Sequence, residues 1–261
     1  MTADAKAGKI ATLLDTLPTA RPQRTNYFEE GRKASWLDPQ AILIRFPKIY
    51  ALFQGYLSPC WTLKNWKSDL PDPQTHVLVN MGCGSRQLHP AVLNVDFVDF
   101  PHVDIHADFS RPLPIRTASV DGVLSIAVLE HLEKPLLMIS EITRILKPGG
   151  VLYITVPFLY PFHAAPADYN RWTAEGIKLQ LGGQFEVTSS ESCGAAVGVL
   201  ILVFSHIVAQ ILSFGSERLY LLANYSMMGL LAPLKLFDLL LTHLPFSKTL
   251  CPCVTLVARR K

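Results

Sequence analysis

Glycines and acids follow three consecutive apolar runs in the first half of the chain. Gly82 and Gly84 flank Cys83 after one run, Asp96 closes the next, and Asp108 follows a third. Two glycines let a ligand approach the backbone near a helix N-terminus, which favours a carboxylate or phosphate. A carboxylate at a strand end can accept hydrogen bonds from ribose hydroxyls, and Asp108 could accept from an adenine amino group or be an ordinary turn acid. The pattern predicts a site for a nucleotide-type ligand.

A second group of polar and aromatic side chains lies between residues 158 and 173. His163 is the candidate catalytic base for an oxygen or nitrogen acceptor, because imidazole exchanges protons near neutral pH. A helix-capping or loop-bracing role is the alternative. The candidate substrate contacts are Tyr160, Asp168, Tyr169 and Arg171. For Asp168 and Arg171, an ion pair that fixes the loop is favoured over direct contact with substrate.

A parallel sheet would bring these two groups together. From residue 76 to about residue 190, β-branched runs alternate with helical stretches, which is typical of βαβ units and an α/β fold. Strands are predicted at residues 77–81, 92–96, 103–108, 120–126, 151–156 and 253–258, and a helix at residues 135–146 that a Lys-Pro-Gly-Gly turn stops. The carboxyl ends of parallel strands meet at one edge, where such folds bind ligands.

Gly82, Gly84, Asp96 and Asp108 as a set resemble the ligand-binding residues of class I S-adenosylmethionine-dependent methyltransferases. Leu-Glu-His at residues 129–131 and Leu-Lys-Pro-Gly-Gly-Val-Leu-Tyr-Ile at residues 146–154 are similar to motifs of the type 11 branch. The pattern P-x-H-x-x-P-x-D-Y-x-R-W-T at residues 161–173 resembles the signature of a type 11 subgroup, many of whose genes neighbour genes for bacterial polysaccharides and surface lipids. The resemblance covers roughly residues 76–185.

The resemblance implies a Rossmann-like, seven-stranded, mostly parallel sheet with helices on both faces. It also implies S-adenosyl-L-methionine as cofactor. Its methionine part would lie along Gly82 and Gly84, its ribose at Asp96 and its adenine at Asp108, with residues 127–129 closing over the adenosine. The full set of implied cofactor contacts is Asn80, Gly82, Cys83, Gly84, Asp96, Phe97, Asp108, Phe109, Ala127 and Val128.

Two positions depart from the family pattern. Asn80 stands where the family has an acid before the first glycine, and Arg86 replaces a later glycine. An amide can still hydrogen-bond the ammonium group of the cofactor, but it carries no opposing charge. A cofactor-binding, inactive membrane scaffold is therefore the alternative function. A nicotinamide oxidoreductase is disfavoured by Gln87 at the third glycine position of the dinucleotide pattern and by the Pro-Gly-Gly turn.

The chain changes character after residue 192. We expect a helical N-terminal extension (1–70), a methyltransferase core (71–192), an apolar helical insert (193–247) and a final strand of the core sheet (248–261). The first stretch of the insert runs for about 20 residues without a charge, long enough to cross a bilayer. Because the last strand must return to the sheet, the insert crosses a membrane twice, lies in the interface, or forms ordinary core or dimer-interface helices. Interfacial association is favoured, since it does not place Lys235 and Asp238 in lipid.

Composition bounds the remaining possibilities. A net charge of +3 is too balanced for an electrostatic nucleic-acid binder. Five cysteines without a paired framework fit a reducing compartment, and the Cys-Pro-Cys run at residues 251–253 has no second ligand pair, so no metal site is expected. The first 15 residues have no apolar core of a signal peptide. We therefore expect a cytoplasmic, membrane-associated enzyme with a small-molecule, lipid or lipid-linked saccharide acceptor.

Overall fold

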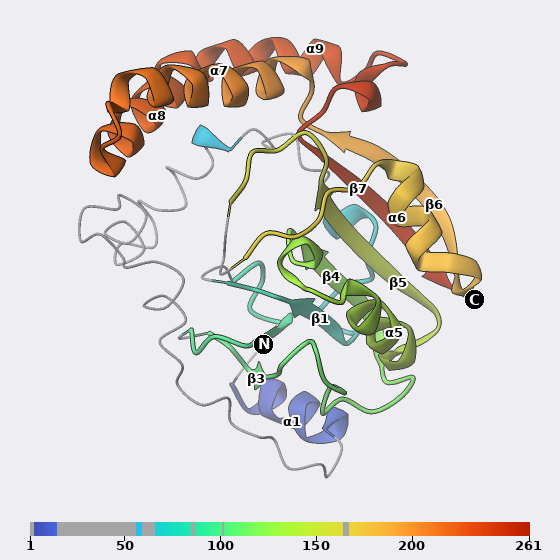
Figure 1. Cartoon of the computed structure of the whole chain (residues 1–261). Coiled ribbons are helices and arrows are strands. Elements are labelled where there is room, and N and C mark those ends of the chain that lie inside the picture. Colours follow the sequence, from blue (N-terminus) through green and yellow to red (C-terminus); the bar gives the residue numbers. More distant parts are fainter. Residues whose placement is uncertain (1–2, 15–55, 59–65, 85–86, 101, 164–166) are drawn as a thin grey trace.

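A seven-stranded sheet forms the centre of the protein (Figure 1). The computed structural model describes residues 3–14, 56–58, 66–84, 87–100, 102–163 and 167–261. Its strands are β1 (Leu78–Met81), β2 (Leu93–Asp96), β3 (Ile105–His106), β4 (Val120–Ile126), β5 (Leu146–Pro157), β6 (Phe185–Cys193) and β7 (Cys253–Arg260). Its longer helices are α1 (Ala3–Leu13), α5 (Pro135–Ile145), α6 (Ala174–Leu181), α7 (Ala196–Ser213) and α8 (Glu217–Leu231). Shorter helical turns are η1 (Trp66–Ser68), η2 (Leu129–His131), η3 (Gly182–Gln184), η4 (Ala232–Phe237), α9 (Asp238–Leu241) and η5 (Ser247–Thr249).

The strand order is β3-β2-β1-β4-β5-β7-β6. Strands β1 to β5 pair in parallel, whereas β7 is antiparallel to both β5 and β6. The predicted Rossmann-like, mostly parallel α/β fold is therefore confirmed. Because β1, β2, β3, β4 and β5 run in one direction, the residues that follow them gather at a single edge of the sheet.

Alternating side chains of the buried strands fill a core on each face of the sheet. On one face, Val79 and Met81 of β1 pack in a cluster with residues of α1, α5 and α6. On the other face, Leu78 packs in a smaller cluster. Among the described residues, Trp66 of η1 and the nearby Leu70 cover this face. The site is thus built on strands that are held from both sides.

Helix α5 shows how local sequence sets the boundaries of the elements. Its buried residues Met138, Ile139, Ile142 and Ile145 recur at helical spacing, which turns one side of the helix to the sheet. The predicted stop is confirmed to within one residue, since the helix ends at Ile145. The Lys-Pro-Gly-Gly run, however, was wrongly expected to precede the next strand, because it lies inside β5. A register shift against β4 accommodates these residues as a bulge.

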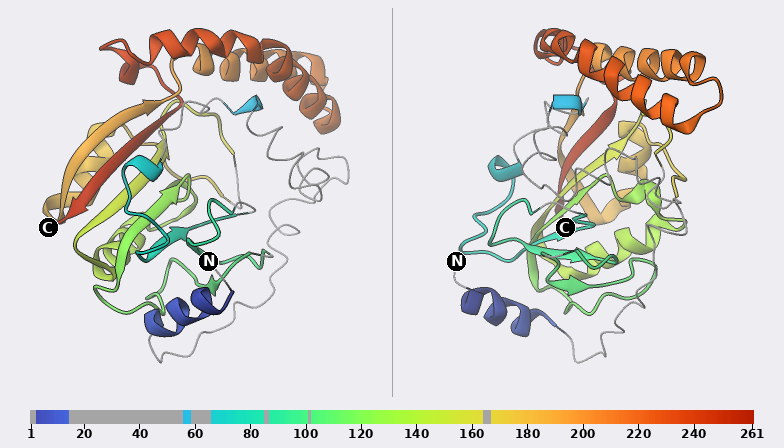
Figure 2. Two further views of the ribbon diagram at one scale, coloured as in Figure 1. Left: turned by 180° about the vertical axis from the view of Figure 1, so that it is seen from behind. Right: turned by 90° about the vertical axis from the view of Figure 1, so that its left-hand side faces the viewer.

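The apolar insert folds into the helices α7, α8, η4 and α9 between β6 and β7 (Figure 2). Helices α7 and α8 form a hairpin that lies over the edge of the sheet at which β5 ends and β7 begins (Figure 1). The small residues Gly198, Ser205 and Ala209 are buried on α7, which allows close packing in the hairpin. The prediction of a helical insert before the last strand is confirmed.

Two of the charged residues of the insert, Lys235 and Asp238, are buried and paired within the protein. Asp238 accepts hydrogen bonds from the backbone N–H groups of Ala195, Val197 and Gly198, at 3.2, 3.0 and 2.9 Å, at the start of α7. Lys235 donates to the backbone carbonyls of residues 56 and 58. A carboxylate at a helix N-terminus and an ammonium on carbonyls both satisfy charges that burial would otherwise make costly.

Much apolar surface of the insert faces outward. On α7 the exposed side chains include Leu200, Val203, Phe204, Ile207 and Ile211. Within the described residues, α7 is the one helix long and apolar enough to span a membrane, and 39% of it is buried in the protein. Core helices of soluble proteins meet the same criterion, so this finding alone does not place the chain in a membrane.

Little of the expected N-terminal extension falls within the described residues. Helix α1 covers one core through Leu13, and Leu14 forms a β-bridge with Ile115. Residues 15–55 and 59–65 lie outside the described part of the chain. The bounds of the four predicted segments remain predictions.

Candidate active site

The glycine turn after β1 is shaped by its neighbours. Gly82 has φ +69°, and a Cβ built there would lie 2.5 Å from Cγ2 of Val128. Gly84 has φ +54°, and a Cβ there would meet nothing within 4 Å. L-residues rarely adopt these angles, so both positions favour glycine. The first glycine lets the ends of β1 and β4 pack together, and the second opens onto free space.

Asp96 at the end of β2 is tied to this turn. Its carboxylate accepts a hydrogen bond from the backbone N–H of Gly84 at 2.8 Å and one from Val98 at 2.9 Å. The side chain is buried. A carboxylate has about four acceptor sites, so two such bonds leave capacity for hydroxyl donors. The structure therefore brings the predicted glycine turn and the predicted ribose acid into direct contact, with half-buried Phe97 next to them.

Cys83 lies between the two glycines and is buried. Burial, followed by the neighbouring Asp96 carboxylate, raises the pKa of this thiol to about 12. The thiol is therefore neutral near pH 7 and is a poor nucleophile. The buried position of Cys83 in the turn favours a packing role, with or without a bound ligand.

Asn80 on β1 points its amide across the sheet. Its Nδ2 donates to Oδ1 of Asn94 on β2 at 3.2 Å, and Asn94 donates in turn to the carbonyl of His102 at 3.1 Å. Both asparagines are buried. The two residues lie opposite each other in the parallel pairing of β1 and β2. This amide pair occupies the place of the acid that the family pattern led us to expect. Arg86, the second departure from that pattern, lies outside the described residues.

Asp108 follows β3 at the same edge of the sheet. Its carboxylate accepts from the N–H of Ser110 at 2.9 Å and from the hydroxyl at 2.7 Å, and it faces Arg111 at 3.4 Å. The neighbouring Phe109 is buried in the main core. The acid thus holds a local turn, which leaves its predicted contact with adenine untested.

The end of β4 carries a strained residue. Ala127 has φ +55°, an uncommon angle for a residue with a side chain, and its N–H donates to the carbonyl of Thr155 at 2.9 Å. Such strain gathers at functional sites. Ala127 is exposed, whereas Val128 packs against Gly82. The predicted lid over the adenosine therefore adjoins the glycine turn.

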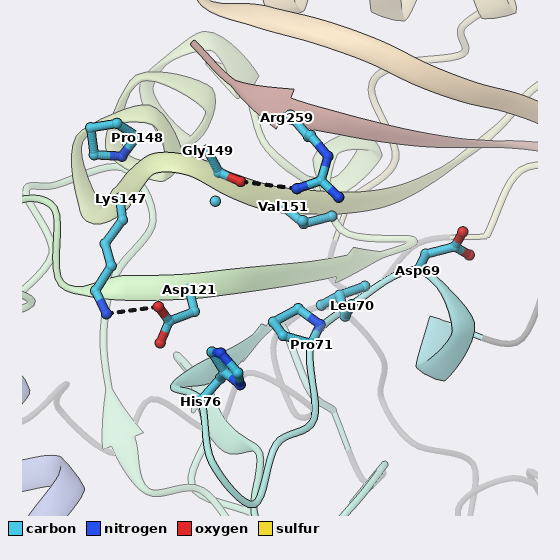
Figure 3. A pocket seen from close by; sticks show the side chains of 11 residues that line it. Asp69, Leu70, Pro71, His76, Asp121, Lys147, Pro148, Gly149, Val151 and Arg259 are labelled. Carbon is cyan, nitrogen blue, oxygen red and sulfur yellow. Dashed lines mark hydrogen bonds and ion pairs between the residues drawn. The ribbon is translucent and has the colours of Figure 1, made fainter.

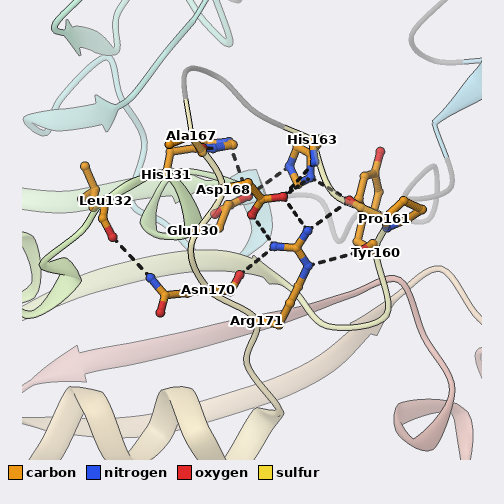
Figure 4. Close-up of polar contacts among 10 residues, drawn as sticks. All are labelled: Glu130, His131, Leu132, Tyr160, Pro161, His163, Ala167, Asp168, Asn170 and Arg171. Atoms are coloured by element: carbon orange, nitrogen blue, oxygen red, sulfur yellow. Dashed lines mark hydrogen bonds and ion pairs between the residues drawn. The ribbon is translucent and has the colours of Figure 1, made fainter. Parts of the chain in front are cut away.

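The loop after β5 is braced by a buried ion pair (Figure 4). Arg171 binds both carboxylate oxygens of Asp168 and also donates to the carbonyls of Tyr160 and Pro161, each at 3.0 Å. Burial alone would raise the pKa of Asp168, but these bonds and the N–H of His163 outweigh it and lower that pKa to about 2. The predicted ion pair is confirmed, and both side chains are engaged in holding the loop.

His163 lies inside this braced loop. Its Nδ1 is 3.1 Å from the carbonyl of Pro161 and 3.3 Å from Oδ2 of Asp168, and its Nε2 is 3.6 Å from Oε1 of Glu130. Both ring nitrogens therefore face acceptors of the protein itself. This arrangement favours the bracing role over that of a base open to substrate, and the catalytic role stays a prediction.

Two tyrosines frame the loop. The ring of Tyr160 lies 4.8 Å from that of His163 and packs against a cluster that includes Leu202 of α7 and Met228 of α8. Tyr169 is half exposed, and its hydroxyl donates to Glu133 at 3.2 Å. Their contact with an acceptor stays a prediction, and Tyr160 joins the loop to the insert.

Glu130 is a residue of this site that the sequence interpretation missed. It belongs to η2, directly after β4, and its side chain is fully buried although it carries a carboxylate. The signal was an acid between apolar neighbours in Val-Leu-Glu-His-Leu, which was interpreted only as part of a family motif. The neighbouring His131 closes η2, four residues before α5 begins.

A pocket of about 450 Å³ lies elsewhere, where β4 and β5 begin (Figure 3). The ion pair of Asp121 and Lys147 and the bond from Arg259 to Gly149 border it. None of the predicted site residues lines it. Because ligands of such folds bind at the carboxyl ends of strands, this pocket at the opposite edge does not compete with the glycine turn.

Comparisons with known proteins find a methyltransferase domain match in this part of the chain. Residues 79–154 match the methyltransferase domain family. A curated relative from Mycolicibacterium smegmatis, named a probable S-adenosylmethionine-dependent methyltransferase, is 41% identical over 58 residues. That match covers 22% of this chain and 23% of the relative. The family match ends before residues 161–173, so the subgroup resemblance of that passage stays a prediction.

One solved structure is similar in fold, and a second is less similar. Haemonchus contortus phosphoethanolamine N-methyltransferase 2, in complex with S-adenosyl-L-methionine, has TM-score 0.51 and 15% identity over 85% of this chain and 59% of that chain. Burkholderia thailandensis 1,6-didemethyltoxoflavin-N1-methyltransferase has TM-score 0.45 and 14% identity over 85% of each chain. With the match of residues 79–154, the comparisons support a methyltransferase domain in this part of the chain and S-adenosyl-L-methionine as its cofactor.

Proposed function

We propose that this protein transfers a methyl group from S-adenosyl-L-methionine to a small-molecule, lipid or lipid-linked saccharide acceptor at a membrane surface. The contact between Asp96 and the N–H of Gly84 carries the proposal. It fixes a buried carboxylate beside a glycine turn with open space above it. Free acceptor sites on that carboxylate suit ribose hydroxyls, and open backbone suits the methionine part.

Methyl transfer from this cofactor requires little covalent catalysis by the protein. The cofactor supplies a methyl group already activated by a sulfonium, so an acceptor atom needs chiefly to be placed in line with it. The braced loop at residues 158–173, with Tyr160 and Tyr169 on its surface, lies at the edge where the acceptor would enter. We propose that this loop orients the acceptor and excludes water.

Calorimetric titration with S-adenosylmethionine tests the cofactor site. Asp96→Asn keeps the shape and one acceptor oxygen but removes the charge, so we expect affinity to fall at least ~10-fold, or about 1.4 kcal/mol. Asp99→Asn is the matched control, because Asp99 is mostly exposed and faces His106. Circular dichroism checks that both variants fold. Equal affinity in the wild type and Asp96→Asn would refute the assignment.

An inactive, cofactor-binding scaffold remains the second candidate. The observation that favours it is Asn80, whose amide donates to Asn94 where the family pattern has an acid. Incubation with cofactor and membrane extract, followed by measurement of the demethylated product, separates the two. Binding without product formation in extracts from the native host would favour the scaffold.

The insert supports the membrane-surface part of the proposal. Leu200, Phe204 and Ile207 expose an apolar stripe on α7 at positions one helical turn apart. A helix pair with such a stripe is suited to lie in the headgroup region of a bilayer. Because α7 and α8 contact Tyr160 beside the site, a membrane-bound insert would hold the acceptor loop close to lipid.

A further inference from the structure

Glu130 has a fully buried carboxylate without a hydrogen-bond partner in the described part of the chain. Neither Oε1 nor Oε2 accepts a hydrogen bond from the described residues, and the side chain has no solvent exposure. Burying an unpaired carboxylate costs several kcal/mol, so native proteins pair such groups with a cation or with donors. The position of this carboxylate therefore calls for a positive partner.

Two imidazoles lie around that carboxylate (Figure 4). Nε2 of His131 is 3.9 Å from Oε1 of Glu130, and Nε2 of His163 is 3.6 Å from the same oxygen. One ligand atom from each of these three residues lies within 4.8 Å of the other two. The two rings are 5.2 Å apart and nearly perpendicular. The three residues come from η2 and the loop after β5, so the fold brings them together from two segments.

The other nitrogen of each ring is already bound. Nδ1 of His131 lies 2.6 Å from the carbonyl of Ala167, and Nδ1 of His163 lies 3.1 Å from the carbonyl of Pro161, beside the Asp168 carboxylate. A carbonyl accepts only a proton-bearing nitrogen, so in the neutral rings Nδ1 carries the proton and Nε2 presents a lone pair. Histidines that bind metals are oriented in this way by carbonyls and carboxylates.

We propose that Glu130, His131 and His163 bind a divalent cation of the zinc class. Two imidazoles and one carboxylate are the ligand set of catalytic zinc and of non-haem iron sites. Bonds of about 2.0–2.2 Å require these ligand atoms, now within 4.8 Å of one another, to approach to roughly 3.5 Å, a contraction of at most about 1.3 Å. Three protein ligands leave coordination positions for water or for an oxygen of the acceptor. The sequence predicted no metal, because these ligands are not clustered along the chain.

Cobalt(II) binding to the metal-free full-length protein, without cofactor, tests the proposal. We expect one equivalent to bind with visible absorption bands of ligand-field type, to be displaced by zinc, and to raise the melting temperature. Glu130→Gln and His163→Gln should each weaken cobalt affinity at least ~10-fold and remove the thermal shift. His243→Gln is the control, because His243 lies after α9 and its ring contacts the backbone carbonyl of Leu239, away from Glu130.

Two results would overturn the metal site. One is a wild-type protein that takes up no stoichiometric cobalt or zinc. In that case the three residues contact one another without a metal ion. The other is unchanged affinity in His163→Gln, whose partly exposed ring makes it the variant expected to fold if Glu130→Gln does not. Binding of S-adenosylmethionine is measured separately, so failure of the metal site leaves the proposed methyl transfer intact.

Discussion

Gly82 and Gly84 differ in the constraint that each places on the turn, although both have positive φ. At Gly82 a side chain would collide with Val128, so the residue joins β1 to the end of β4. At Gly84 a side chain would enter open space and would cost only backbone strain. The first glycine is therefore structural, and the second is the one that leaves room for a ligand.

Alanine at each position separates these roles. Gly82→Ala should lower the free energy of unfolding by about 2–4 kcal/mol, from strain and collision. Gly84→Ala should cost about 1–2 kcal/mol of strain but weaken S-adenosylmethionine binding, because its methyl group occupies the space above the turn. Urea denaturation and calorimetry measure both effects. A stable Gly84→Ala variant with native cofactor affinity would contradict the proposed position of the ligand.

The carboxylate of Glu141 on α5 makes the stability of the fold depend on pH in the acid range. Burial alone would raise the pKa of Glu141, but bonds from Arg144 and the N–H of Leu113 outweigh it and hold that pKa below its usual 4.5. Its contribution to stability is therefore complete above about pH 4.5 and is lost as pH falls through the lower folded value. Unfolding measured between pH 6 and pH 3 should show a weaker acid dependence in Glu141→Gln.

The assignment of this acid dependence to Glu141 is contradicted if Glu141→Gln and the wild type lose stability in parallel as the pH falls. Glu175→Gln serves as the control, because the ion pair of Glu175 with Lys178 is largely exposed. Exposed pairs contribute little, so this variant should follow the wild type.

At the residue scale, the sequence predicted positions better than partners. It placed Gly84 and Asp96 at neighbouring strand ends, and they do meet, because strand ends follow from the apolar pattern. It could not predict that Asn80 pairs with Asn94, since that requires the register of β1 and β2. Glu130 was missed for a similar reason, because its surroundings come from a loop more than 30 residues away.

At the element scale, Asp238 joins α9 to the start of α7 within the insert. Its buried carboxylate binds three N–H groups at the start of α7, groups that a helix cannot satisfy itself. Helix α8 has a conventional N-cap residue, Ser216, whose side chain makes no capping bond. Two helices of one hairpin thus begin in different ways, one held by a distant acid and the other by packing.

Alanine substitutions at Asp238 and Ser216 test whether α7 and α8 begin in these different ways. Asp238→Ala should lower the free energy of unfolding by about 2–4 kcal/mol, because three buried donors lose a charged acceptor. Ser216→Ala should change it by less than about 0.5 kcal/mol. Urea denaturation followed by circular dichroism gives both values. Equal and small effects would show that α7 does not depend on this cap.

Element boundaries were predictable where the local pattern decides them. Strand β4 matches its predicted residues 120–126, and α5 begins at Pro135, where proline suits a first turn. The Lys-Pro-Gly-Gly run was wrongly placed outside the strand, because its glycines and proline signal a turn. Pairing with β4 draws them into β5 as a bulge, a tertiary effect that the local sequence does not contain.

At the scale of the whole molecule, the insert and the site share one end of the fold. The helices α7 and α8 lie across the edge where the parallel strands end, and Tyr160 connects them to the loop that carries His163. Lys235 and Asp238 are buried within the protein, and α7 itself contains no Asp, Glu, Lys or Arg, so its exposed apolar stripe carries no formal charge. Such a surface is suited to a lipid interface without spanning it.

Vesicle sedimentation tests this arrangement. A triple variant, Leu200→Ser, Phe204→Ser and Ile207→Ser, should bind vesicles of phosphatidylglycerol and phosphatidylcholine at least ~10-fold more weakly, since each buried apolar side chain contributes about 1.5–3 kcal/mol. The control changes an equal number of exposed leucines, Leu136, Leu137 and Leu179, to serine on α5 and α6. Both sets cost similar helix propensity, so only the place of the apolar surface differs.

The three possible outcomes distinguish the roles of the insert. Loss of binding in the α7 variant alone, with the wild type released by alkaline carbonate, is the result expected for helices lying in the interface. Resistance of the wild type to carbonate would instead indicate a spanning hairpin, because a crossing helix is not extracted by charge or pH. If the wild type does not sediment with vesicles, the exposed stripe must be covered by protein, and the acceptor of the methyl group has no reason to be lipid.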